Sequence, residues 1–424
     1  MKEKSYYLGE NGKGVKLKEF ELEMLKFLFQ QKLLTSKQLY TYFNYFSDLS
    51  YNTFRNKIWR WSKYKVIKMK NITLKKRWGN EANIITIGTN GIKILISEGY
   101  LPESFSTTSV KSNFSIYNYD HYFGTQQTVL NTILRLKTYG VDIDSIRPSD
   151  FPLEMHENSQ YIVPDWILRS ENKLLLIETD MGNEPLGTLV DKVKRYVEIK
   201  KNYPDYEFIV LFVLIDDSLN TQKIYKNNGE KRLANMKKVF LNLNLIHDLN
   251  FSLNVSHLKQ SAKIAENLLL DSKVSSRQLM IAQKSLEELN QQFDYTFTEL
   301  NDEQVYLHDT PEFLYADRAF RLSNLAQTYS TNVLFVVVTE GNIQQLDRLY
   351  YLNLAIQKGL FREKVDKIIA IYQKKDDWMN DNFGQGMQHV LVADTETWLQ
   401  NLKSEPDFYK VIGPNKLKHT VFED

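Results

Sequence analysis

Three acidic residues and one lysine stand close together in the middle of the sequence, at spacings that suit metal-dependent chemistry. Asp165 follows a proline, Glu178 and Asp180 end an apolar run, and Lys192 lies in the next amphipathic stretch. Residues two apart on a strand point to the same face of a sheet, and a neighbouring strand would bring Asp165 within reach. Mg²⁺ commonly takes one or two carboxylates, with waters and substrate phosphate completing its shell. The pattern favours a Mg²⁺ or Mn²⁺ site in which Lys192 offsets phosphate charge.

A purely structural explanation of the acids stays open. Acids are common at strand ends, and Gly182-Asn183 directly after them is typical of an ordinary turn. Tyr196 lies one helical turn after Lys192, so the two side chains can face the same edge of the sheet.

The elements around these residues follow from hydrophobic periodicity. Helical spacing of apolar residues predicts helices, and short apolar runs bounded by turn residues predict strands. The helices are expected at 119–137, 186–201 and 228–241, and the strands at 152–155, 161–168, 174–178 and 208–215. This order predicts a mixed sheet flanked by helices, with Asp165 on the middle strand and the wholly apolar 208–215 strand inside the sheet.

The N-terminal region predicts a winged helix-turn-helix. Helices are expected at 17–34, 37–43, 54–64 and 89–96, and two strands at 66–74 and 84–87. Thr35-Ser36 is a helix N-cap signal for the second helix. A cationic third helix and a cationic loop between the strands suit the major groove and the phosphates of double-stranded DNA.

Ten lysines and arginines, and no acid, lie between Arg55 and Arg77. The candidate DNA contacts are Arg55, Lys57, Arg60, Lys63, Lys75, Lys76 and Arg77. DNA binding explains this charge better than a solvated basic face or a protein-docking module, although both alternatives stay open.

The C-terminal third carries no motif with a chemical function. Residues 258–293 predict a long helix, broken near Ser275-Ser276, which is a spacer, an oligomerisation arm or a packed helical hairpin. Strands at 332–339, 367–372 and 389–393 and a helix at 343–354 predict a small α/β unit. Its apolar strand followed by a helix resembles the 208–215 region, which raises the hypothesis of a degenerate internal duplication.

Composition sets the remaining limits. The chain has 424 residues, which predicts several domains, and no cysteine, which excludes disulfides and thiol chemistry. The expected domains are 1–104 (winged helix), 115–250 (nuclease-like), 255–330 (helical arm) and 331–424 (small α/β unit). A polar N-terminus and the lack of long apolar runs predict a cytoplasmic protein without membrane insertion.

The motifs Pro164-Asp165, Ile177-Glu178-Thr179-Asp180 and Lys192-Val193-Lys194-Arg195-Tyr196, placed after a winged helix, resemble the replication-relaxation family of mobile-element proteins. The resemblance extends to the PD-(D/E)XK nuclease superfamily and to MOBC-type conjugative relaxases, and it covers roughly residues 15–245. It implies a restriction-endonuclease-like core with Asp165, Glu178 and Asp180 as metal ligands. The nuclease pattern places its lysine where Asp180 stands, so Lys192 or Lys194 would have to supply it from the helix. The resemblance adds His121 and Gln126 as further candidates.

The expected function is therefore a metal-dependent nickase acting at a plasmid or mobile-element origin, together with other transfer or replication proteins. Tyrosine-dependent relaxases need a His-x-His motif, and the seven histidines contain none. Two alternatives stay open. One is a non-catalytic, sequence-specific DNA-binding regulator with a degenerate nuclease core, and the other is a protein-interaction adaptor.

Overall fold

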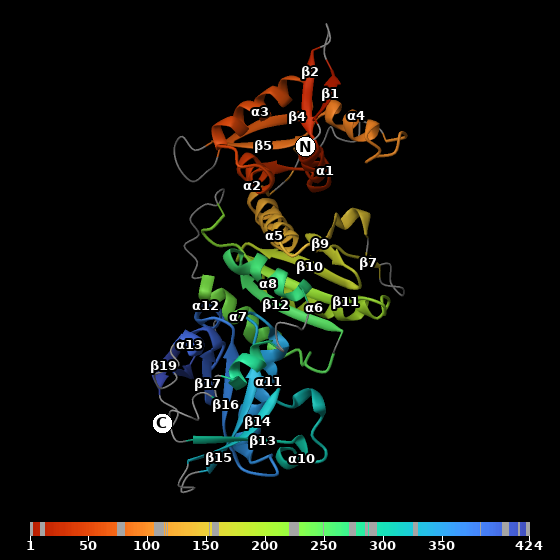
Figure 1. Cartoon of the computed structure of the whole chain (residues 1–424). Helices are drawn as coiled ribbons and strands as arrows, with labels where there is room; N and C mark the ends of the chain where they lie inside the picture. Colours follow the sequence, from red (N-terminus) through yellow and green to blue (C-terminus); the bar gives the residue numbers. More distant parts are fainter. Residues whose placement is uncertain are drawn as a thin grey trace.

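Figure 1 shows three units that follow one another in chain order, with the N-terminal unit at one end and the C-terminal unit at the other. The computed structural model describes residues 3–8, 13–73, 81–105, 114, 116, 118–151, 153–154, 161–219, 229–248, 250–270, 277–284, 287, 295–324, 330–381, 383–400, 407–413 and 416–420. The predicted wing-tip residues Lys75, Lys76 and Arg77 lie outside these ranges. Within them, no helix combines the length and the apolar character that crossing a membrane requires.

The N-terminal unit contains the expected helices and hairpin. Its elements are β1 (Glu3–Tyr7), β2 (Gly14–Lys18), α1 (Glu19–Gln31), β3 (Leu34–Thr35), α2 (Ser36–Phe46), α3 (Tyr51–Lys63), β4 (Ile67–Thr73), β5 (Glu81–Ile87) and α4 (Thr89–Ser97). β4 and β5 pair antiparallel, and β3 adds a third strand beside β5. The β1–β2 hairpin was not predicted from the sequence.

Local sequence explains where the helices of this unit begin. Thr35 caps α2 as predicted, because its hydroxyl accepts a hydrogen bond from the Gln38 amide while the Gln38 side chain bonds the Thr35 amide. Ser50 caps α3, which starts earlier than expected. Phe54, Ile58 and Trp61 of α3 are buried, as the helical spacing predicted.

The central unit is a five-stranded mixed sheet with the strand order β12-β11-β10-β9-β6. Its elements are α5 (Tyr119–Lys137), β6 (Asp144–Ile146), β7 (Leu153–Glu154), β8 (Tyr161–Ile162), β9 (Trp166–Ser170), β10 (Lys173–Asp180), α6 (Leu186–Lys200), β11 (Glu207–Leu214), α7 (Gly229–Leu241), β12 (Phe251–His257) and α8 (Leu258–Leu270). α5 and α8 pack on one face of the sheet, and α6 and α7 pack on the other. The predicted mixed sheet flanked by helices is confirmed, and β11 lies inside it.

Two expectations about the central strands were wrong. The predicted strand 161–168 is divided: β8 pairs with β7 in a separate small sheet, and β9 begins only at Trp166. Asp165 therefore lies in a bend just before β9 instead of on the strand. The segment Val163-Pro164 separates the two strands, since proline has no amide hydrogen for a sheet ladder.

The region 255–330 is not a helical arm. β12 extends the central sheet, and α8 packs against α5 and the sheet because its apolar face is buried there. Residues 277–284 are helical, whereas Ser275-Ser276 lies outside the described residues. β13 (Tyr295–Leu300) and β14 (Arg318–Asn324) then belong to the C-terminal sheet.

The C-terminal unit is larger than predicted. Its seven strands follow in sheet order from β13 to β19. The other elements are α10 (Asp302–Val305), β15 (Ser330–Val337), α11 (Ile343–Lys358), β16 (Val365–Tyr372), α12 (Lys375–Asn380), β17 (Met387–Asp394), α13 (Thr395–Gln400), β18 (Phe408–Gly413) and β19 (Lys416–Thr420). The three expected strands and the helix of the α/β unit are all present.

The central and C-terminal units share one connectivity. In both, an antiparallel hairpin (β9–β10 or β14–β15) is followed by a helix and a parallel strand, and then by a second helix and parallel strand. A matching aspartate precedes each hairpin. The Asp165 amide donates to the Ile177 carbonyl, and the Asp317 amide donates to the Phe335 carbonyl, both at 2.9 Å. The hypothesis of an internal duplication gains direct support from this shared topology.

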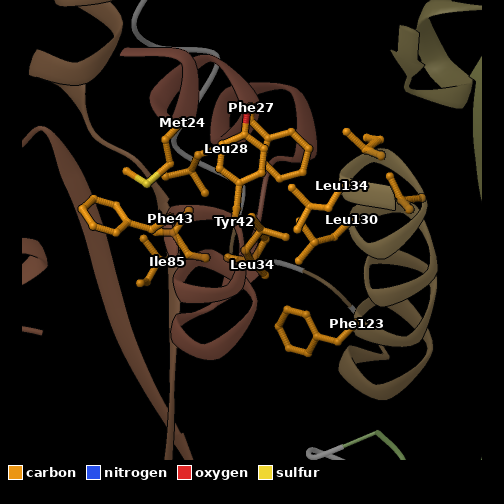
Figure 2. Close-up of a cluster of buried hydrophobic side chains, with 14 of the residues drawn as sticks. Met24, Phe27, Leu28, Leu34, Tyr42, Phe43, Ile85, Phe123, Leu130 and Leu134 are labelled. Atoms are coloured by element: carbon orange, nitrogen blue, oxygen red, sulfur yellow. The ribbon is translucent and has the colours of Figure 1, made fainter. Parts of the chain in front are cut away.

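The N-terminal unit packs tightly on the central unit through α5. Figure 2 shows Phe123, Leu130 and Leu134 of this helix projecting toward Leu34 and Tyr42 of the N-terminal unit. Polar contacts cross the same boundary. They include Gln38 Nε2 to the Phe123 carbonyl at 2.9 Å, Gln31 Nε2 to Ser145 Oγ at 2.7 Å, and Arg147 Nη2 to the Phe29 carbonyl at 2.6 Å. The two units therefore share a single core.

Candidate functional site

The site is built around Asp165, which is held by the backbone of β10. The Thr179 amide donates to Oδ2 of Asp165 at 2.6 Å, and the Asp165 amide donates to the Ile177 carbonyl at 2.9 Å. These two bonds bracket Glu178 and hold the Asp165 carboxylate next to it. The Asp165 side chain remains 24% exposed, so solvent and ligands can reach it.

Glu178 is a buried carboxylate, only 3% exposed, on the face of β10 that α6 covers. Tyr196 donates a hydrogen bond to its Oε1 at 2.5 Å, and Lys192 Nζ lies 3.2 Å from its Oε2. The pKa of Glu178 is raised to about 7, first by burial and second by the charge of Asp165, whereas Lys192 and the Tyr196 hydrogen bond act in the opposite direction. Perturbed carboxylates of this kind concentrate at functional sites.

Lys192 supplies the positive charge from α6, as the sequence predicted. Its Nζ also lies 3.3 Å from Oε2 of Glu184, so it is shared between two carboxylates. Burial lowers the pKa of Lys192, but the charges of Glu178 and Glu184 outweigh that effect and raise it. Lys192 is therefore a persistent cation near neutral pH. This suits it to stabilise negative charge and not to act as a base.

Asp180 points to the same face as Glu178 but has a different partner. Arg232 of α7 donates from Nε to Asp180 Oδ2 at 2.9 Å, and the Gly182 amide donates to Oδ1 at 3.0 Å. The carboxylate is 2% exposed, and Arg232 is itself anchored by a bond to the Glu184 carbonyl, so Asp180 does not fit the predicted role of a metal ligand. Arg232 carries no sequence signal of this role, because it lies 52 residues after Asp180 on a separate helix.

His121 approaches the site from the opposite face of the sheet. Its Nε2 lies 3.3 Å from Asp165 Oδ2, at the start of α5. Burial lowers the pKa of His121, but the hydrogen bond and charge of Asp165 outweigh burial and raise it. On the same side, the hydroxyls of Thr125 and Thr179 bond at 2.7 Å. These contacts connect α5 directly to the strand that carries Glu178.

The remaining candidates of the sequence behave differently. Tyr196 is fully buried and contributes the hydrogen bond to Glu178. Lys194 is exposed on the far side of α6, so Lys192 is the lysine that the fold selects. Gln126 is completely buried in α5, and its amide has no hydrogen-bond partner among the described residues. It therefore bonds neither of the two acids.

The donor set fits a divalent cation only in a limited way. Among the described residues, no three His, Cys, Asp or Glu side chains converge as metal ligands. Asp165 and Glu178 do offer two neighbouring carboxylates, which is a number that Mg²⁺ accepts when water and phosphate complete its shell. Of the three predicted acids, Asp165 is open to Mg²⁺ or Mn²⁺, and Glu178 could join it where Lys192 moves away from its Oε2.

The second unit provides an internal comparison. The Val337 amide donates to Asp317 Oδ2 at 2.7 Å, as the Thr179 amide does to Asp165. Matching hydrogen bonds therefore align Val336 with Glu178. Arg348 of α11 binds the Asp317 carboxylate at 2.8 Å. The second unit keeps the aspartate but lacks the neighbouring acid.

The exposed face of α3 carries three of the four DNA contacts that were predicted on this helix. Arg55, Arg60 and Lys63 are exposed. Lys57 is an exception, because it pairs with the fully buried Glu21 and lies over the rings of Phe43 and Trp61. Its ammonium group is therefore committed to the core of the N-terminal unit, and its role there is structural.

Trp59 was missed as a surface residue of this helix. It is 66% exposed, and Lys63 Nζ lies 5.9 Å from its ring centroid. A groove of about 530 Å³ between α3 and the hairpin is lined by Trp59, Arg55, Asn52, Asn56 and Asn83. Arginine and asparagine are side chains that read base edges. The helical spacing of residues 52, 55, 56 and 59 indicates from the sequence alone that these side chains share one face of α3.

These features define a mixed α/β protein in which a unit with an exposed cationic helix is packed on a sheet with a buried carboxylate pair. The sequence model of the replication-relaxation family matches residues 25–210, a span that includes α3, Asp165, Glu178 and Lys192. The chain is similar to this family over that region, and the similarity suggests a role related to plasmid replication or relaxation. No curated protein and no solved structure matches the chain.

Proposed function

We propose that this protein binds double-stranded DNA at a plasmid or mobile-element origin through α3 and the β4–β5 hairpin, and nicks it with a metal-dependent site in the central unit. Asp165 and Glu178 are the metal ligands of this proposal, and Lys192 stabilises the phosphate. Mg²⁺ or Mn²⁺ would supply Lewis-acid chemistry there.

One observation carries the proposal. Val336 is fully buried at the position of the second unit that matches Glu178. The same fold therefore forms with an apolar side chain at this position, so folding does not require an acid there. A buried carboxylate whose pKa is raised to about 7 is costly, since burial disfavours its charged form. A functional role explains why the central unit keeps it.

The contacts assign separate tasks to the residues of the site. The β10 backbone fixes Asp165, and Tyr196 orients the Glu178 carboxylate. Lys192 stays cationic and is placed to offset the charge that develops on a cleaved phosphodiester. His121, bonded to Asp165, is the group next to the site that can exchange a proton near neutral pH.

The core that the N-terminal and central units share would fix the orientation of bound DNA relative to the carboxylate pair. α5 carries His121 at its start and packs against α2 of the N-terminal unit. The Gln38 side chain bonds the α5 backbone at Phe123. DNA held on α3 would therefore lie at a fixed orientation to the carboxylate pair, which suits cleavage at a defined distance from a recognised sequence.

A non-catalytic DNA-binding regulator is the second candidate. It is favoured by the neutralisation of Glu178 by Lys192 and of Asp180 by Arg232, which leaves neither acid with an unpaired charge. This protein would bind its origin with the same salt dependence but would be indifferent to metal. A protein-docking adaptor would show no DNA binding at all.

Incubation of supercoiled DNA carrying the replicon's own origin with the protein and Mn²⁺ tests the proposal. We expect open circles with the wild type, and loss of nicking in Glu178→Gln and Lys192→Met while origin binding is retained. Asp191→Asn, an exposed acid on the same helix, is the matched control and should nick normally. Metal-independent binding without nicking by the wild type would establish the regulator instead.

A further inference from the structure

A cavity of about 330 Å³ lies between the central and C-terminal units, away from the carboxylate pair. Lys263 and Asn267 of α8 line one side. Thr339 and Glu340, which follow β15, and Gln373, which follows β16, line the other. The cavity thus lies at the carboxyl ends of two parallel strands, where α/β proteins bind ligands. Its volume is within the range of small-molecule sites.

Two buried acceptors in this cavity have no hydrogen-bond partner in the part of the chain that the structure describes. Glu340 is 6% exposed and Gln278 is 5% exposed. Neither Oε2 of Glu340 nor Oε1 of Gln278 has a hydrogen-bond partner among the described residues. Buried polar atoms are almost always hydrogen-bonded, so an unsatisfied pair at one cavity indicates a missing donor.

Glu340 is a buried acid that no lysine or arginine of the described residues contacts. Lys263 pairs with Asp377, and the buried Lys237 pairs with Asp381. The pKa of Glu340 is raised to about 8, first by burial and then by the charges of Asp381 and Asp377, whereas Lys237 and Lys263 act in the opposite direction. When the Glu340 carboxyl group ionises, a bound cation would therefore stabilise its charge.

We propose that this cavity binds a small organic cation of the alkylammonium class, with Glu340 as its counter-ion and Gln278 as an acceptor for its N–H groups. Both unsatisfied atoms are acceptors, so a ligand that donates hydrogen bonds satisfies both at once. The ligand would contact residues of both units and so stabilise their interface. The proposal is independent of nicking, because it shares no residue with the carboxylate pair.

Ionisation of Glu340 makes the binding depend on pH. A carboxyl group with a pKa of about 8 is mostly protonated at pH 7 and half ionised at pH 8. Because the cation selects the ionised form, its affinity should rise about fivefold from pH 7 to pH 8. Protons should be released on binding at pH 7.

Titration calorimetry of the full chain with 1,4-diaminobutane tests the proposal, with butane-1,4-diol and succinate as probes of equal carbon-chain length. We expect the diamine to bind and the diol and the diacid not to bind. Binding should be lost in Glu340→Gln and weakened at least tenfold in Gln278→Met. The exposed Glu303→Gln variant should bind like the wild type.

Three results would overturn the proposal: no binding of the diamine, preferential binding of succinate, or diamine binding that Glu340→Gln leaves unchanged. Thermal melting of each variant shows whether it is folded, and Gln278→Met is a second, uncharged test if Glu340→Gln unfolds. Nicking activity does not enter these readouts, so failure here leaves the proposed function untouched.

Discussion

Ionisation of Glu178 should make the stability of this protein depend on pH, and replacement of Glu178 by Gln should remove that dependence. The folded protein raises the pKa of this carboxyl from 4.5 to about 7, first because it is buried and second because Asp165 lies nearby. Folding therefore favours the protonated form. Below pH 4.5 this group does not lower the free energy of unfolding, because it is protonated in both the folded and the unfolded state. The free energy of unfolding decreases as the pH rises from 4.5 to 7, and this decrease is complete above pH 7.

The size of the effect follows from the shift. Each pKa unit corresponds to about 1.4 kcal/mol, so the free energy of unfolding should decrease by about 2.5 kcal/mol between pH 5 and pH 8 through this group. No discount for solvent applies, because Glu178 is 3% exposed. Relative to the wild type, Glu178→Gln should gain that amount over the same range.

Urea unfolding in EDTA at several pH values measures this difference. Titrating groups that do not sense the charge of Glu178 cancel, because they are common to both proteins. Glu198→Gln, an exposed acid on α6, should follow the wild-type curve and serves as the control. Parallel curves for Glu178→Gln and the wild type would contradict the prediction, since they would mean that Glu178 ionises equally well in both states.

Two further outcomes concern the other units. Arg55→Ala and Lys63→Ala should each reduce the slope of log affinity for origin DNA against log salt by roughly 0.9 for every phosphate that the variant no longer neutralises, whereas the exposed Lys358→Ala on α11 should leave it unchanged. If the two α3 variants show the same salt slope as Lys358→Ala in a filter-binding titration, α3 is not part of the DNA interface. Lys237→Met should destabilise the protein by about 3–5 kcal/mol in urea unfolding, because it leaves buried Asp381 uncompensated; a decrease below about 1 kcal/mol would show that the pair is not closed in solution.

Long periodic segments of the sequence predicted their elements well. The bounds of α5 agree with the prediction, because an asparagine cap and a regular apolar stripe define it. β11 was recognised from its wholly apolar run, and Lys192 was correctly placed beside Glu178. These features are local, so a single stretch of sequence contains the necessary information.

Features that depend on distant residues were missed. Asp180 was expected to bind metal, but Arg232 neutralises it from another helix. β12 was not recognised, because its polar residues Asn254 and Ser256 interrupt the apolar pattern, although both are buried. Val336 could be matched to Glu178 only through the backbone hydrogen bonds of Asp317, which the sequence does not reveal. Pairing between remote segments decides all three cases.

Calorimetric titration of Mn²⁺ into the wild type and into Glu178→Val, the substitution that copies the second unit, asks directly whether the carboxylate pair holds a metal. We expect a single Mn²⁺ on the wild type, none on Glu178→Val, and unchanged origin binding by both. Equal Mn²⁺ binding by the two proteins, or none by the wild type, would contradict a metal role for Glu178.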